Sequence, residues 1–191
     1  PMSAPDPKNI DEVMQKLSKE LTHMRVLLVD RHANARNSLR IILSTLGVSA
    51  VHNAASAAEV LRQVKAYPFD IILADYHLDD DRDGQQLLEE LRQKHLISLA
   101  TVYMVITAER AYHTGVSVAE LAPDDYLIKP FTAEQLQSRL GRALYKKHFF
   151  SRVFEHLDNG AFVDALGACE GLIGRDDQFL YDTLRFKGEI L

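Results

Sequence analysis

The chain has 191 residues, of which 47% are hydrophobic and 26% charged, as expected for a globular protein with one full-sized domain and a small extra unit. Its net charge of −5 disfavours binding to a nucleic-acid backbone, which needs a basic excess. Cys169 is the single cysteine, so no intrachain disulfide can form, and no stretch approaches the roughly 20 apolar residues of a membrane helix. We expect a cytoplasmic protein without direct nucleic-acid or membrane contact.

The N-terminal region is predicted to be a tail followed by one helix. Residues 1–8 contain three prolines and are interpreted as a disordered tail or an expression remnant. Residues 9–23 are predicted to form a helix, capped by Asn9, because apolar residues recur with the helical period. These residues are Ile10, Val13, Met14, Leu17 and Leu21. We expect the stripe to pack on its own domain or on a second copy rather than to bind a ligand.

Five apolar segments then follow as predicted strands, at residues 26–29, 48–51, 69–74, 101–106 and 126–128. Strands that are apolar on both faces are typical of a parallel sheet covered by helices on each side. The helix after the first strand is expected to begin at Asn34, with Gly47 at its C′ position. The strands alternate five times with helical segments, and this alternation predicts a doubly wound parallel sheet with helices on both faces.

Two further helix starts are marked by capping boxes. Residues 56–59 read Ser-x-x-Glu, and residues 132–135 read Thr-x-x-Gln, which are the patterns in which the first and last side chains cap the helix together. Another helical stretch is predicted at residues 109–121, between the fourth and fifth strands. Each of these segments connects two predicted strands or follows the last one.

Four polar residues end four of the predicted strands: Asp30, Asp75, Thr107 and Lys129. Because the carboxyl ends of parallel strands lie on the same edge of a sheet, we expect these side chains to meet there. An aspartate can act as a nucleophile toward phosphorus, a divalent ion can neutralise charge, and a lysine with a threonine can hold phosphoryl oxygens. The sequence therefore predicts a site that accepts a phosphoryl group.

The sequences around these strand ends resemble one known family. LLVD occurs at the first strand, DIILAD at the third, ITA at the fourth and DYLIKPF at the fifth. In their order and spacing, residues 24–146 resemble a receiver domain of bacterial two-component response regulators. The resemblance implies a flavodoxin-like fold with a five-stranded parallel sheet in the order 2-1-3-4-5, and a cis peptide bond before Pro130.

The resemblance also assigns a role to each residue at the strand ends. It implies that Asp75 is the phosphorylated aspartate, that Lys129 contacts the phosphoryl group, and that Thr107 is the switch hydroxyl. Tyr126 would be the aromatic switch. The implied ligands of a magnesium ion are Asp30, Asp75 and the backbone carbonyl of His77.

One position departs from the family pattern. The family usually has two neighbouring acids after the first strand, the second a direct metal ligand, and Arg31 occupies that second position. A missing carboxylate predicts weaker Mg²⁺ binding and slower phosphorylation. Alternatively, the guanidinium replaces the ion by pairing with Asp75. A third interpretation turns Arg31 toward solvent, with water completing the metal's ligand shell.

The loop after the third strand is one residue longer than the family pattern and lacks its proline. Residues 79–84, with Glu90, match the calcium-loop pattern of EF-hands. We interpret this match as a coincidence, because a buried strand precedes the loop and Gln86 occupies the usually aliphatic eighth position. The alternative is that the extra acids reach toward the metal that Arg31 disfavours.

Residues 147–191 are predicted to be helical. Apolar faces at residues 149–157 and 162–172, separated by a turn at 158–160, predict a C-terminal helix hairpin. The run GAFVDALGACEGLI resembles the second half of a tetratricopeptide repeat (TPR), and Cys169 is interpreted as a small core residue. Such repeats need stacked neighbours, so we expect a truncated TPR-like region. The alternative is a helical extension that packs on the receiver or mediates a homodimer.

The predicted function is a two-component signalling switch that is not itself an enzyme beyond self-catalysed phosphoryl transfer. A sensor histidine kinase or a phosphotransfer protein would donate a phosphoryl group to Asp75, and the helical region would pass the signal to a protein partner. Acids outnumber bases in residues 148–191, which disfavours direct DNA contact. Because of Arg31, a pseudo-receiver adaptor that works without phosphorylation remains the alternative.

Overall fold

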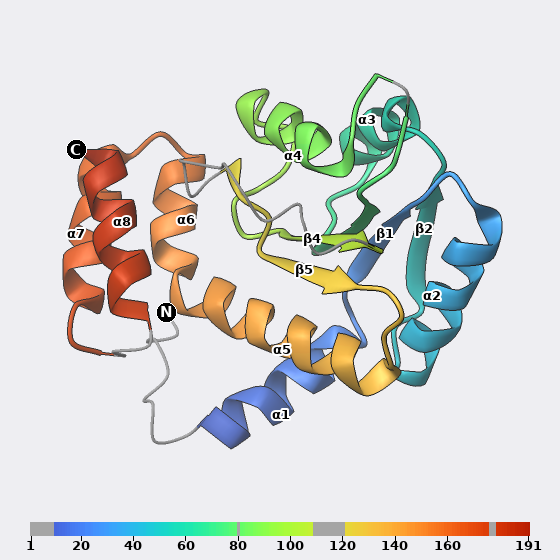
Figure 1. Ribbon diagram of the computed structural model, residues 1–191. Coiled ribbons are helices and arrows are strands. Elements are labelled where there is room, and N and C mark those ends of the chain that lie inside the picture. Colours follow the sequence, from blue (N-terminus) through green and yellow to red (C-terminus); the bar gives the residue numbers. More distant parts are fainter. Residues whose placement is uncertain (1–9, 80, 109–120, 176–178) are drawn as a thin grey trace.

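A computed structural model describes residues 10–79, 81–108, 121–175 and 179–191 (Figure 1). Strands and helices alternate along the first part of the chain, and helices alone follow. The elements of the first part are α1 (Ile10–Leu21), β1 (Arg25–Val29), α2 (Ala33–Thr45), β2 (Ala50–Ala54), α3 (Ala57–Ala66), β3 (Ile71–Asp75), α4 (Gly84–Gln93), β4 (Val102–Thr107), β5 (Asp125–Ile128) and α5 (Ala133–Phe149). The helices after them are α6 (Ser151–Asp158), α7 (Phe162–Leu172) and α8 (Leu180–Ile190).

The five strands form one parallel sheet in the order β2-β1-β3-β4-β5. In the middle of the sheet, Val26 of β1 pairs with Ile71 of β3, and Ile71 pairs in turn with Val102 of β4. These strands are apolar and buried because helices cover them on both sides. The predicted flavodoxin-like sheet and its strand order are confirmed.

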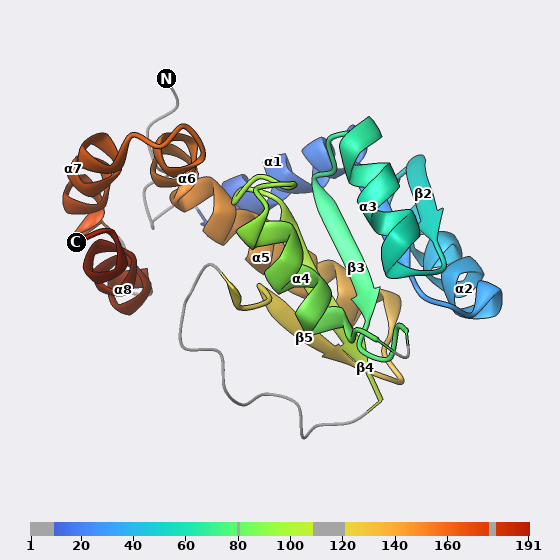
Figure 2. The same cartoon turned by 90° about the horizontal axis from the view of Figure 1, so that it is seen from above.

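Helices cover both faces of the sheet, as Figure 2 shows from above. α2, α5 and α1 lie on one face, and α3 and α4 lie on the other. Because successive strand residues point to opposite faces, β1 supplies Leu28 to the first core and Leu27 to the second. β3 does the same with Leu73 and Ile72. The doubly wound arrangement predicted from the alternating pattern is therefore confirmed.

The N-terminal helix α1 packs on α5 of the same chain. Leu17 and Leu21 are 5% and 4% exposed, and both belong to the core on that face of the sheet. Of the two expected partners of the apolar stripe, its own domain and a second copy, the structure shows the first. In the part of the chain that the structure describes, no helix is long and apolar enough to cross a bilayer.

The predicted helix ends are partly confirmed. Gly47 has a φ of +88° after α2, as a C′ glycine should. However, α2 begins at Ala33, with His32 in the N-cap position, rather than at Asn34. The helix predicted at residues 109–121 falls almost wholly outside the described residues.

The capping boxes differ in how closely they follow the pattern. Thr132 and Gln135 exchange both bonds at the start of α5, as predicted. Ser56 Oγ accepts from the Glu59 N–H at 3.2 Å, but the Glu59 carboxylate accepts from the N–H of Ala55 instead of the cap residue. Glu59 therefore caps the turn one residue earlier than predicted.

The C-terminal region contains the predicted hairpin and one helix more. α6 and α7 pack side by side through the turn at Gly160, whose φ is +70°. α8 packs on α7, and the side chain of Phe186 meets that of Phe150 with ring centroids 5.0 Å apart. Cys169 is buried in this core, as predicted. Asp158 at the end of α6 joins the helices to the sheet, since its carboxylate accepts from Ser98 Oγ at 2.6 Å.

Candidate functional site

The four polar residues predicted to meet at the ends of the strands do lie at one edge of the sheet. Asp75 is the last residue of β3, Thr107 the last of β4, and Asp30 and Lys129 follow β1 and β5 directly. Lys129 Nζ lies 3.2 Å from Asp75 Oδ1 and 3.7 Å from Asp30 Oδ2. The Lys129 N–H donates to the backbone carbonyl of Thr107 at 2.8 Å. We call this group of four residues the carboxyl-edge site.

The carboxyl-edge site has more negative than positive charge. One ammonium, from Lys129, faces two carboxylates, and the Asp75 side chain is 12% exposed. Burial raises the pKa of Asp75; nearby Lys129 lowers it and Asp30 raises it, and the net effect is a pKa above the usual range. A further cation or an electrophile at this place would be stabilised by the charge of these carboxylates.

Asp30 is held in place by its neighbours. Asp30 is 3% exposed, and its Oδ1 accepts from the N–H of His32 at 2.7 Å. Its backbone carbonyl accepts from Arg36 Nη1 at 2.5 Å. Oδ1 of this carboxylate thus stabilises the turn that leads into α2, while the other oxygen, Oδ2, faces Lys129. The backbone at this turn explains why an acid at the end of β1 points into the site.

Arg31 lies beside the site but is turned toward solvent. Its side chain is exposed, and its Nε donates to His32 Nε2 at 3.3 Å. Among the ion pairs of the described residues, none joins Arg31 to Asp75. The pair with Asp75 is thus absent from the described ion pairs, whereas the effect of Arg31 on Mg²⁺ binding stays a prediction.

Gly84, at the start of α4, brings the loop after β3 back against the carboxyl-edge site. Its N–H donates to the backbone carbonyl of Tyr76 at 2.7 Å. A Cβ atom at position 84 would lie 2.5 Å from the backbone oxygen of Asp75, which is too close for any side chain. Only a glycine allows this approach, so the first turn of α4 is placed directly beside the acceptor strand.

The acids of the EF-hand-like pattern point in different directions. Asp79 accepts from the N–H of Ala57, and Asp83 caps α4 together with Gln86. Glu90 pairs with Arg82 and with Lys94. Within the described ranges no three acidic, histidine or cysteine side chains gather as a metal group. Asp79, Asp83 and Glu90 are thus bonded to separate protein groups, and the coincidence stays an interpretation.

Two tyrosines connect the strands to the first turn of α4. The predicted switch residue Tyr126 is partly buried, and its hydroxyl lies 3.2 Å from Gln85 Oε1. Tyr103 is fully buried in β4, and its hydroxyl donates to the backbone carbonyl of Gly84 at 2.5 Å. Tyr103 was not among the predicted site residues, although a hydroxyl inside an apolar strand needs a buried partner and could have indicated it.

His77 follows two residues after Asp75. Its charge is the smallest of the influences that lower the pKa of Asp75, and its ring centroid lies 5.2 Å from that of Tyr76. The role predicted for its backbone carbonyl, as a metal ligand, remains a prediction. The peptide bond between Lys129 and Pro130 is cis, as the resemblance implied.

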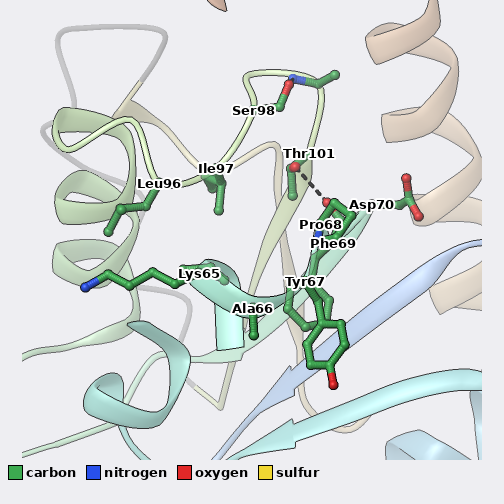
Figure 3. Close-up of a pocket in the computed structure, with 12 residues that line it drawn as sticks. Lys65, Ala66, Tyr67, Pro68, Phe69, Asp70, Leu96, Ile97, Ser98 and Thr101 are labelled. Carbon is green, nitrogen blue, oxygen red and sulfur yellow. Dashed lines mark hydrogen bonds between the residues drawn. The ribbon is translucent and has the colours of Figure 1, made fainter. Parts of the chain in front are cut away.

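A cavity of about 460 Å³ lies at the opposite edge of the sheet. Its lining includes the segments that precede β3 and β4, and Figure 3 shows Pro68, Phe69, Ser98 and Thr101 around it. In that view Thr101 Oγ1 donates to the Phe69 carbonyl at 2.8 Å. None of the carboxyl-edge residues lines this cavity, so it is not part of the site.

Comparisons with known proteins agree with this geometry. Residues 26–141 match the family described as "Response regulator receiver domain". Chemotaxis protein CheY-3 of Vibrio cholerae is 28% identical over 120 residues, which are 63% of this chain and 91% of the relative. A probable transcriptional regulator, ycf27 of Cyanidium caldarium, is 30% identical over 67% of this chain, which spans about half (48%) of the relative.

Solved structures show the same fold. The chemotaxis response regulator CheY4 of Vibrio cholerae has a TM-score of 0.56 and 25% identity, over 63% of this chain and 98% of that chain. The receiver domain of the sensor histidine kinase PA1611 of Pseudomonas aeruginosa has a TM-score of 0.54 and 24% identity, over 63% and 97% of the two chains. That second structure has a magnesium ion coordinated in its active-site cleft.

Proposed function

The chain belongs to the response regulator receiver domain family, and from this premise we propose that it is a phosphorylation-dependent switch with Asp75 as the acceptor. The observation that carries the proposal is the contact of Lys129 with both Asp75 and Asp30 at the carboxyl edge. Receiver domains are regulatory domains of two-component systems rather than enzymes in the ordinary sense. The donor is a phosphohistidine of a sensor kinase or of a phosphotransfer protein.

The proposed reaction is one displacement at phosphorus. A carboxylate oxygen of Asp75 attacks the phosphorus, the new O–P bond forms, and the P–N bond to the donor imidazole breaks with its electron pair leaving on nitrogen. Lys129, 3.2 Å from Asp75, neutralises charge on the transferred group. The hydroxyl of Thr107, at the end of the adjacent strand, then donates to a phosphoryl oxygen.

The carboxyl-edge site fits a magnesium ion. Carboxylate and carbonyl oxygens are the ligands that Mg²⁺ prefers, and the excess negative charge of Asp30 and Asp75 suits a cation. We assign the ion to Asp30, Asp75 and the backbone carbonyl of His77; when bound, it neutralises the phosphoryl oxygens. Because Arg31 stands where the family has a second acid, the proposed affinity for Mg²⁺ is lower than in relatives that keep it.

The proposed output is a change in protein contacts. Movement of Thr107 toward the phosphoryl group would leave space for Tyr126 to turn inward and give up its contact with Gln85. The receiver would comprise residues 24–146, and the TPR-like helices of residues 147–191 would present the signal to a protein partner or to a second copy. We propose the cytoplasm as the location, where such kinases phosphorylate their regulators.

Incubation with acetyl phosphate and Mg²⁺, followed by intact mass and amide chemical shifts, tests the proposal. The wild-type protein is expected to gain one phosphoryl group, and Asp75→Asn is expected to gain none. Asp164→Asn, an exposed acid on α7, serves as the matched control and should react like the wild type. Arg31→Asp is expected to lower the Mg²⁺ concentration that the reaction needs.

The alternative function is a pseudo-receiver adaptor whose surface binds partners without phosphorylation. The observation that favours it is the exposed Arg31 in the position of a metal-site acid. In this case acetyl phosphate, or beryllofluoride with Mg²⁺, produces no mass gain and no chemical-shift change that depends on Asp75. That outcome would reject the switch and retain the fold.

A further inference from the structure

A second group of charged side chains lies around a cavity between the sheet and the C-terminal helices. The cavity has a volume of about 190 Å³. Its charged lining consists of Arg92, Asp124, Lys146, Lys147, Asp182 and Arg185. Asp124 immediately precedes β5, so the cavity opens at the edge where the strands begin, away from Asp75. We call it the seam cavity.

The lining of the seam cavity carries four cations and two carboxylates. Lys147 pairs with Asp124 at 2.9 Å, and Lys146 pairs with Asp182 at 3.0 Å, so each carboxylate already has an ammonium partner. The four cations outnumber the two carboxylates within this lining, and Arg185 also pairs with Glu189, which lies outside it, at 3.4 Å. The lining of the seam cavity thus contains more cations than carboxylates, whereas carboxylates outnumber the ammonium at the carboxyl-edge site.

The two guanidinium groups of the lining have different partners. Arg92 is 7% exposed and donates to the backbone carbonyls of Ser98 and Thr101 at 2.5 and 3.1 Å. Arg185 lies one helical turn from Glu189, whose carboxylate is 3.4 Å away and does not line the cavity. Arg92 is thus fixed by α4 and the segment before β4, whereas Arg185 approaches from α8.

Burial and the neighbouring cations both lower the pKa of Lys147. Its side chain is 12% exposed, donates to the Leu99 carbonyl at 2.6 Å, and lies 4.8 Å from the centre of the Phe154 ring. Burial lowers the pKa of Lys147 to about 8, with Asp124 acting against this and Arg92 and Lys146 lowering it further. An anion in the cavity would offset this repulsion among the cations.

The size of the cavity limits what it can hold. A water molecule takes about 30 Å³ of liquid, so the cavity has room for roughly six waters or an anion of a few heavy atoms. Pockets for drug-sized ligands are larger, about 300 to 1,000 Å³. We propose that the seam cavity binds a small, doubly charged oxyanion of the phosphate class, held by Arg92, Lys147 and Arg185.

An anion at this place would join the sheet to the C-terminal helices. Arg92 belongs to α4, Lys147 to α5 and Arg185 to α8. Figures 1 and 2 show that α6, α7 and α8 stand together at one end of the sheet, where α5 ends. Neutralising the three cations together therefore favours the arrangement in which α8 is docked, and it links ligand binding to the position of the helical region.

Titration with inorganic phosphate, at constant ionic strength with chloride, tests the site. Amide chemical shifts are recorded on Asp75→Asn, so that the carboxyl-edge site takes no part in phosphorylation. We expect saturable shifts around residues 122–124, 146–147 and 182–186. Glycerol phosphate is the second probe: tighter binding than inorganic phosphate would identify a phosphomonoester as the ligand, and weaker binding would identify free phosphate.

Three variants distinguish a specific anion site from a general attraction of anions. Arg185→Gln is expected to weaken phosphate binding about tenfold, the effect of losing one charged hydrogen bond. Lys146→Gln, on α5 rather than α8, is also expected to weaken phosphate binding. Arg152 is an exposed cation on α6, so Arg152→Gln should change phosphate binding less than about twofold. Equal weakening by Arg152→Gln and Arg185→Gln, or unsaturable shifts in the wild type, would overturn the proposal.

Discussion

The two ends of one parallel sheet carry opposite charge imbalances. At the carboxyl edge, one lysine faces two aspartates, and burial keeps the pKa of Asp75 raised. At the seam cavity, four cations face two carboxylates, and burial keeps the pKa of Lys147 low. In both places the residues that face one another carry more charge of one sign than of the other, although Glu189, outside the seam cavity, pairs with Arg185. We infer that such an imbalance marks a place where a ligand of the opposite charge completes the structure.

The two places also differ in how their buried charges are paired. The Lys147–Asp124 pair is buried and supports the fold directly, because Asp124 also accepts from the Tyr103 N–H at 2.7 Å. Asp75 and Asp30, in contrast, are brought together although both are negative. Breaking a pair should therefore cost stability, whereas removing a surplus charge should not. Lys147→Gln and Asp75→Asn test this difference, and Gly84→Ala tests the close packing at the carboxyl edge.

The largest effect is expected for Lys147→Gln. It leaves the carboxylate of Asp124, 15% exposed, without its ammonium partner, and unpairing a buried charge typically costs about 3 kcal/mol. Lys187→Gln is the matched control, because Lys187 pairs with the exposed Glu170 and a surface pair contributes about 0 to 1 kcal/mol. Urea unfolding measures both variants; equal losses would show that the seam pair contributes no more than a surface pair.

Gly84→Ala is expected to have an intermediate effect at the carboxyl edge. Its Cβ would meet the backbone oxygen of Asp75, and relieving such overpacking typically costs about 1 to 3 kcal/mol. Gly167→Ala in α7 meets nothing within 4 Å and should stabilise the helix by about 0.5 to 1 kcal/mol. The sign of the change in unfolding free energy thus distinguishes the two glycines; a stabilising Gly84→Ala would contradict the close approach.

The smallest effect, and the one of opposite sign, is expected for Asp75→Asn. The raised pKa means that the folded protein binds more protons than the unfolded chain from about pH 4 up to that pKa, so stability falls as pH rises through this range. At pH 7 the neutral amide removes this cost, and the melting temperature should increase. Below about pH 4 the gain should vanish, because the wild-type carboxyl is protonated as well.

Circular dichroism over a pH series measures this prediction. Asp164→Asn, whose side chain is exposed, serves as the control and should shift the melting temperature little at any pH. If Asp75→Asn lowers the melting temperature at pH 7, the pair with Lys129 outweighs burial and the repulsion from Asp30. The contrast between a surplus charge and a paired charge would then not hold at this edge.

Much of the carboxyl-edge site could be predicted because its residues are tied to sequence pattern. Asp30, Asp75, Thr107 and Lys129 each end an apolar run, and parallel strands bring such ends to one edge. Local spacing also predicted the glycine turn after α2 and the capping box at Thr132, since these depend on contacts a few residues apart.

The sequence by itself thus determined the alternation of strands and helices and the residues at the strand ends. Only the tertiary structure showed α8 docked on α7, the turn of Arg31 toward solvent, and the bond from Tyr103 to Gly84. It also assembled the seam cavity from residues that lie between positions 92 and 186 on separate elements. Sequence periodicity indicates which side of one element is apolar. A cavity depends instead on how several elements pack, and packing brings together residues that are far apart in the sequence.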